Sequence, residues 1–142
     1  MYKRQLFERA LAIREKVLGP QHPATATSLN NLALLLQAQG DLAAARPLQE
    51  RALAIWEKAL GPEHSHTARG LHNLAGLLQD QGDLAAARPL QERALAILEK
   101  VLGPEHLDTA KSRENLARLI KDQRSLAGGR SVTTSGSGFT EP

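Results

Sequence analysis

The chain has 142 residues, a formal net charge of +3 and no cysteine, which excludes disulfides and thiolate metal sites. Its first residues are too charged for a secretory signal, and no apolar run approaches the roughly 18 residues of a membrane span, so we expect a cytoplasmic protein without a membrane partner. Lysine and arginine alternate with glutamate and the aromatic residues are scattered, which argues against nucleic-acid binding.

One long segment of the sequence occurs twice with almost no change. Residues 40–64, GDLAAARPLQERALAIWEKALGPEH, return as residues 82–106 with only Trp56/Leu98 and Ala59/Val101 differing. A partial third copy, ERALAIREKVLGPQH, covers residues 8–22. A fixed period of 42 residues predicts an array of stacked units rather than one globular core.

Within each period the apolar residues recur three or four positions apart, which predicts helices. In chain order, the expected helices cover residues 3–17, 23–39, 42–60, 66–80, 84–100 and 108–122. Glycine-proline pairs or a single glycine end them, Pro23 starts the second, and Asp41 caps the third by accepting free amide hydrogens. Because the links are short, consecutive helices should be antiparallel.

The two ends of the chain do not complete a unit. Residues 1–18 correspond to the second helix of a truncated unit, residues 19–60 and 61–102 to two complete units, and residues 103–123 to the first helix of a partial one. In residues 124–142 the capping aspartate has become Ser125, and glycines replace alanines at 128 and 129. We therefore expect residues 124–142 to be a degenerate, disordered tail.

Paired helices with Leu32-Ala33, Gly40, Ala45 and Ala52 in series resemble the tetratricopeptide repeat. The longer unit in residues 11–53 is similar to the 42-residue variant of kinesin light chain and of many bacterial scaffold proteins. The resemblance implies an all-α, right-handed solenoid of antiparallel helix pairs. It also implies that the first helix of each unit lines a concave groove that binds a protein or peptide.

The resemblance assigns four groove positions to each first helix, and these positions differ between units while the scaffold scarcely changes. Selection for a partner and drift at exposed sites both explain this variation. The groove positions are Thr27, Asn30, Leu34 and Gln37, then Arg69, His72, Gly76 and Gln79, then Lys111, Glu114, Arg118 and Lys121.

A further polar residue recurs in every first helix, directly before the leucine-alanine pair: Asn31, Asn73 and Asn115. In some tetratricopeptide proteins, an asparagine here forms a ladder along the backbone of an extended peptide. Alternatively, each asparagine caps or bridges neighbouring helices. Both interpretations stay open at the level of sequence.

Neither a metal site nor a catalytic centre is expected. The recurring His22, His64 and His106 belong to successive units at least ~8–10 Å apart, so they cannot share one ion, and capping of the turn explains them better. The sequence shows no nucleophile–base pairing and no phosphate-binding loop. We expect no enzyme activity and no cofactor.

The sequence thus predicts an interaction scaffold that holds an extended peptide or a partner helix, as part of a larger bacterial-type repeat protein. The expected binding residues are Asn30, Asn31, Asn73 and Asn115 with Arg69, His72, Gln79, Lys111, Arg118 and Lys121. The alternative is a structural spacer, or a segment that self-associates through its incomplete ends.

Overall fold

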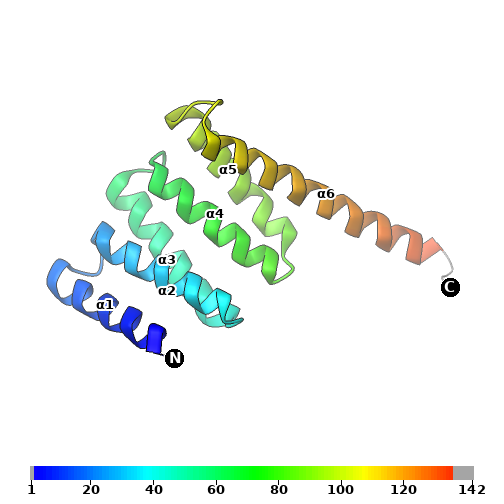
Figure 1. Ribbon diagram of the computed structural model, residues 1–142. Coiled ribbons are helices and arrows are strands. Elements are labelled where there is room, and N and C mark those ends of the chain that lie inside the picture. The colour runs from blue at the N-terminus through cyan, green and yellow to red at the C-terminus, as the bar shows by residue number, and fades with distance from the viewer. Residues whose placement is uncertain (1, 136–142) are drawn as a thin grey trace.

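The computed structural model describes the backbone of residues 2–135 and the side chains of residues 2–128. Six helices follow one another: α1 (Tyr2–Leu18), α2 (Pro23–Ala38), α3 (Leu42–Leu60), α4 (Ser65–Asp80), α5 (Leu84–Val101) and α6 (Leu107–Ser135). No strand occurs in this part of the chain. Each helix packs mainly on its neighbours in sequence, so that α1 and α6 lie at opposite ends of the stack (Figure 1). The predicted all-α solenoid of antiparallel helix pairs is confirmed.

The turn that precedes each first helix is closed by its histidine. The Nδ1 atoms of His22, His64 and His106 accept hydrogen bonds from backbone N–H groups two residues later, at 3.0, 3.0 and 3.1 Å. An N-cap that accepts in this way satisfies an amide that the helix leaves free. The capping role expected for these histidines is confirmed.

The turn inside each complete unit uses a different pair of residues. Gly40 and Gly82 take φ values of 84° and 85°, a left-handed conformation that costs a glycine little. Asp41 and Asp83 follow, and their side chains accept from the N–H groups of Ala44 and Ala86 at 3.2 and 3.1 Å. Together these residues reverse the chain direction within two positions, as the sequence predicted.

Beyond residue 123 the structure differs from the expected tail, because α6 continues as one helix to Ser135. Arg124 stands where Gly40 and Gly82 turn the chain, and a side chain makes the left-handed conformation costly. Ser125 replaces the capping aspartate as well. With neither turn residue present, the helix extends past the level of the turn between α4 and α5 (Figure 1). Residues 136–142 of the expected tail lie outside the described residues.

The core is a layer of leucine and alanine between the helices, with one aromatic residue in it. Alanines such as Ala45, Ala52, Ala87 and Ala94 are fully buried and allow the helices to approach closely. Trp56 is the largest fully buried side chain and packs with Leu29 and Ile55. Trp56 is therefore a large buried contact between α3 and the first helices on either side of it, α2 and α4.

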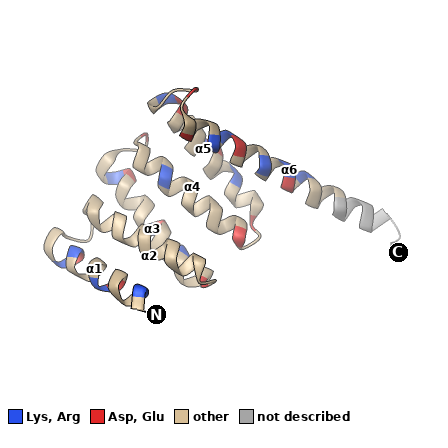
Figure 2. Ribbon diagram, viewed as in Figure 1, with Lys and Arg blue, Asp and Glu red and all other residues tan. Residues whose placement is uncertain are grey.

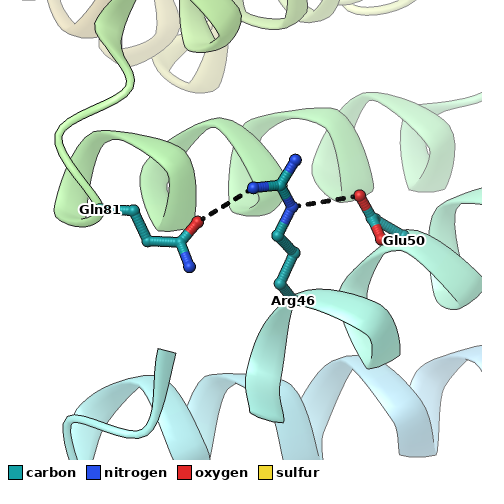
Figure 3. A network of polar contacts seen from close by, with 3 residues as sticks. All are labelled: Arg46, Glu50 and Gln81. Atoms are coloured by element: carbon teal, nitrogen blue, oxygen red, sulfur yellow. Dashed lines mark hydrogen bonds and ion pairs between the residues drawn. The ribbon is translucent and has the colours of Figure 1, made fainter. Parts of the chain in front are cut away.

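Ion pairs join each second helix to the next one. Glu15 and Arg51 pair at 2.6 Å, and one unit later Glu57 and Arg93 pair at 2.6 Å. Pairing across 36 positions could not be predicted from local spacing in the sequence. At the other edge Arg46 joins Glu50, in its own helix, to Gln81 at the end of α4, as Figure 3 shows. These pairs add specificity of stacking, with modest energies because they are partly exposed.

Candidate functional site

We call the surface formed by α2, α4 and α6 the first-helix face. Cations gather toward its C-terminal part, where Arg69, Lys111, Arg118 and Lys121 are all exposed and Glu114 is the acidic residue among the groove positions. On α2 the corresponding positions carry no charge, and Thr27 is half-buried with its hydroxyl donating to the carbonyl of Pro23. Figure 2 shows basic and acidic residues mixed along α6, whereas α2 contains no charged residue. Any anionic ligand would therefore prefer the α4–α6 end.

Asn30, which the sequence placed in the groove, is fully buried in the scaffold. Its Oδ1 accepts two hydrogen bonds of 2.8 Å, one from Gln49 Nε2 of α3 and one from Asn73 Nδ2 of α4. The expectation that Asn30 contacts a ligand is therefore corrected. Its side chain fills the junction of three helices, because the neighbouring unit supplies a polar partner at that depth.

The three repeated asparagines lie in different surroundings. Asn31 is exposed. Asn73 is half-buried and its Nδ2 donates a hydrogen bond to Asn30, and Asn115 is half-buried beside a cavity. The contact of Asn73 is the one that the bridging interpretation requires, since it joins α2 to α4. Although the three asparagines occupy the same repeat position, they therefore differ in how far their side-chain amides are available to a ligand.

His72 takes part in a relay that corresponds to the Asn30–Gln49 contact one unit earlier. Its Nδ1 lies 3.3 Å from Gln91 Oε1, and Gln91 Nε2 lies 3.5 Å from Gln79 Oε1. Because an amide oxygen can only accept, the His72 ring donates from Nδ1 in this arrangement. His72 and Gln79, both predicted binding residues, are thus tied to a buried glutamine of α5.

A cavity of about 360 Å³ lies between α4, the end of α5 and α6. It brings together four of the predicted binding residues: Arg69, His72, Lys111 and Asn115. Asn31, Gln79, Arg118 and Lys121 do not line it. The remaining lining residues are Ser65, His66, Ala68, Leu98, Leu102, Asp108 and Ser112.

The cavity lies where α5 lacks the tryptophan ring that fills the equivalent space between α3 and α4. Trp56 packs against α4, and the position opposite it is Gly70, where a Cβ would lie 3.2 Å from the ring. One unit later the same two positions hold Leu98 and Ser112, and both line the cavity. Leu98 fills less volume than the tryptophan ring at the equivalent position, and it lines the space left beside α6.

Ser112 has an unusual hydroxyl. The residue is only 4% exposed, and its Oγ has no hydrogen-bond partner in the described part of the chain. The equivalent Ser28 of α2 accepts a 3.0 Å bond from Arg14 of α1, but Leu98 occupies the position of that arginine beside Ser112. A buried hydroxyl without a partner costs free energy, so a ligand that reached it would gain by pairing.

The charge around the cavity is mainly positive. Arg69 and Lys111 line it, and Asp108 is its acidic residue. The Arg69 guanidinium also stands over Trp56, 5.6 Å from the ring centre. Burial lowers the pKa of His66 below 6.5, and the neighbouring His64 and Arg69 lower it further. A neutral His66 leaves Arg69 and Lys111 as the two cations of the cavity.

Sequence reasoning missed Trp56, His66, Leu98 and Ser112. A signal was present: Trp56/Leu98 is one of only two differences between the long copies, and Gly70 stands in the next helix where the equivalent residues are Ser28 and Ser112. Among the described residues no three potential ligands cluster around a metal position. None of their helices has the length and apolar character that crossing a membrane requires.

Comparisons with known proteins agree with the geometry. The family model for the tetratricopeptide repeat matches residues 4–58, 28–97 and 66–124. A crystal structure of nearly identical repeats from a Podosopora anserina putative kinesin light chain is similar, with 29% identity, a TM-score of 0.79, and coverage of 98% of this chain and 69% of that one. BtubC (BKLC) from P. vanneervenii shares the fold at 23% identity and a TM-score of 0.76, over 98% of this chain and 59% of that one. A search of the curated proteins finds no match.

Proposed function

Because this chain belongs to the tetratricopeptide repeat family, we propose that its first-helix face binds an extended peptide of a partner protein, with an acidic side chain at the α4–α6 cavity. Repeats of this family generally mediate protein–protein interaction. The likeness to kinesin-light-chain-like repeats supports the same class of function. The remaining question is which part of the surface receives the peptide.

The cavity carries this proposal. A carboxylate there can accept hydrogen bonds from Arg69 and Lys111 and from the unpartnered hydroxyl of Ser112. Bonds between charged partners are about twice as strong as neutral ones, and Leu98 with Leu102 provides an apolar floor for the methylene groups of the ligand. An acidic side chain uses both features at once.

The rest of the peptide would run along the first helices. Asn115 lies at the cavity and offers a donor and an acceptor to a peptide backbone, while Asn31 is exposed on α2. Arg118 and Lys121 continue the positive charge along α6 and favour a second acidic residue. Asn73 contributes less, because its amide already bonds to Asn30.

Selection of binders from a displayed library of random peptides would test this function. We expect enrichment of acidic residues, and fluorescence polarisation should then show affinities that fall as salt rises. Arg69→Gln and Lys111→Gln should each weaken binding about tenfold, the usual effect of losing one charged hydrogen bond. Lys58→Gln, which removes an exposed cation from α3, is the matched control. Equal losses in all three variants would show that only net charge matters and would contradict a site at the cavity.

A further inference from the structure

His72 offers one ring nitrogen to the cavity, because its other nitrogen is engaged inside the solenoid. Nδ1 lies 3.3 Å from Oε1 of Gln91, a side chain that is only 1% exposed. Nε2, on the other edge of the ring, forms no hydrogen bond within the described part of the chain and is not enclosed. Since His72 lines the cavity, Nε2 is the atom that a bound side chain can reach.

The orientation of Gln91 decides which nitrogen of the neutral ring carries the proton. Nε2 of Gln91 lies 3.5 Å from Oε1 of Gln79, so the amide donor is directed at that oxygen and Oε1 of Gln91 faces His72. An amide oxygen can only accept, so the neutral His72 ring carries its proton on Nδ1. Its Nε2 then holds a lone pair and accepts hydrogen bonds rather than donating them.

A carboxylate cannot form a hydrogen bond with this neutral ring. Ionised aspartate and glutamate only accept, and Nε2 of His72 also only accepts. A second proton turns the ring into an imidazolium, which donates from Nδ1 to Gln91 and from Nε2 to the carboxylate. Histidine is the side chain that takes up such a proton between about pH 5 and 8.

The charges around His72 make its second proton depend on a bound anion. The charged and titratable residues that line the cavity are Arg69 and His66 of α4 and Lys111 and Asp108 of α6. Glu114 of α6 is exposed and does not line the cavity, α5 contributes only uncharged residues to it, and α2 contains no charge. The two cations oppose a third positive charge in the empty cavity, whereas a bound carboxylate favours it.

From this geometry we propose that the cavity takes up its acidic side chain together with one proton, which binds Nε2 of His72, so that affinity rises as pH falls below neutrality. The inference rests on the proposed function, because it concerns the acidic side chain that the first-helix face receives. His72 is then both a binding residue and the group that makes binding sensitive to pH.

Of the three equivalent positions, only that of His72 can work in this way. Asn30 is fully buried, and its Oδ1 accepts from Gln49 and Asn73. Glu114 is exposed and carries a negative charge that repels a carboxylate. His72 combines a ring that can gain a proton, a buried acceptor behind it and a place at the cavity.

His66 also lines the cavity, but its surroundings disfavour a second proton. Its ring packs edge-on against the rings of Trp56 and His64, with centroids 5.6 and 5.0 Å away. Burial lowers the pKa of His66, and the neighbouring His64 and Arg69 lower it further. No side chain accepts a hydrogen bond from this ring within the described residues, in contrast to His72. His66 therefore provides the matched control.

NMR of the 142-residue chain tests the state of the ring directly. Nitrogen–proton correlation spectra distinguish the two neutral tautomers from the imidazolium, and His72→Gln identifies the signals of His72. We expect the Nδ1–H tautomer in the free chain at about pH 8. At about pH 6.5, adding blocked glutamate (acetylated and amidated, so that its side chain carries the only charge) should raise the imidazolium fraction. Blocked glutamine should leave it unchanged. An Nε2–H tautomer in the free chain would overturn the proposal.

The same titrations give the dissociation constant of blocked glutamate. It should fall about tenfold from about pH 8 to about pH 5.5, the effect of one additional charged hydrogen bond. The side chain of glutamate has a pKa of about 4.3, so the probe stays ionised over this range. His72→Gln should abolish the pH dependence and His66→Gln should retain it. The reverse pattern would assign the proton to His66 and overturn the proposal.

The result also separates this inference from the function on which it rests. If Arg69→Gln and Lys111→Gln weaken binding of blocked glutamate but its affinity does not change with pH, the acidic site stands and the proton coupling is wrong. If neither substitution affects blocked glutamate or the acidic peptides from the displayed library, the site at the cavity is wrong and the coupling fails with it. Circular dichroism at each pH verifies that every variant stays folded.

Discussion

Gly70 lies directly against Trp56, so that a Cβ on Gly70 would stand 3.2 Å from Cε3 of the ring and 3.2 Å from Cδ1 of Leu53. The glycine of α4 and the tryptophan of α3 therefore depend on each other. Trp56 is fully buried and can withdraw little, since Leu29 and Ile55 pack around it. This pair distinguishes the α3–α4 interface from the α5–α6 interface, in which Leu98 and Ser112 stand at the same positions.

The effect of Gly70→Ala should depend on residue 56. Alanine gains about 1 kcal/mol of helix propensity over glycine, but in the wild-type chain its methyl group meets the tryptophan ring. In a Trp56→Leu background the contact with the ring is relieved and only the contact with Leu53 remains, so more of the gain should appear. Urea unfolding of the four chains of this cycle should give a coupling of about 1 kcal/mol. Additive effects would show that the ring can move aside.

Copying the α3–α4 interface into the α5–α6 interface should fill the cavity. Leu98→Trp together with Ser112→Gly copies Trp56 and Gly70, removes the unpartnered hydroxyl and should raise the free energy of unfolding by about 0.5–2 kcal/mol. Peptide affinity should fall about tenfold, because the cavity no longer admits a side chain. Calorimetry and fluorescence polarisation on the same protein separate the two effects. Unchanged affinity would place the peptide elsewhere on the first-helix face.

Asn73→Ala should reduce stability by about 0.5–1.5 kcal/mol, the net value of one hydrogen bond, because it removes the donor to Asn30. Asn31→Ala is the control at the same repeat position, since Asn31 is exposed. Affinity for a selected peptide is measured on both proteins. If Asn73→Ala weakens binding while its melting temperature stays unchanged, the asparagine serves the ligand rather than the scaffold.

Acidification should destabilise the protein through His66. Its pKa in the folded state lies below 6.5, so the folded state binds the proton less readily than the unfolded chain does. The stability that His66 contributes is therefore complete above pH 6.5 and is lost as pH falls through the lower folded pKa. Unfolding curves between pH 8 and 5 should show a smaller loss in His66→Gln. An NMR titration that puts the folded pKa of His66 at or above 6.5 would contradict this.

Removal of residues 127–142 should change the melting temperature little. The side chains of residues 124–128 are exposed, so the extension of α6 buries little surface there despite its helical backbone. Helix formation without burial contributes weakly to stability. A fall of many degrees in the melting scan of the shortened chain would show that this segment packs on the solenoid.

The helices and their turns were predictable from the sequence because local interactions form them. Each histidine cap accepts a hydrogen bond from the backbone N–H two residues later, and each aspartate cap accepts one from the N–H three residues later. The turn glycines contribute through their own positive φ angles. The two nearly identical segments adopt the same local structure, so a turn predicted for one segment also applies to the other. The end of α6 was misjudged for the same kind of local reason: loss of the turn glycine at Arg124 extends a helix rather than ending it.

Contacts between units were decided only by the tertiary structure. Asn30 and Asn73 are 43 residues apart, and this spacing does not predict that the side chain of Asn30 is buried and accepts a hydrogen bond from Asn73. The cavity likewise depends on how far Leu98 falls short of the space that Trp56 fills, which requires the distance between packed helices. Local hydrogen bonds follow from neighbours along the chain, whereas burial and empty volume follow from side chains that only stacking brings together.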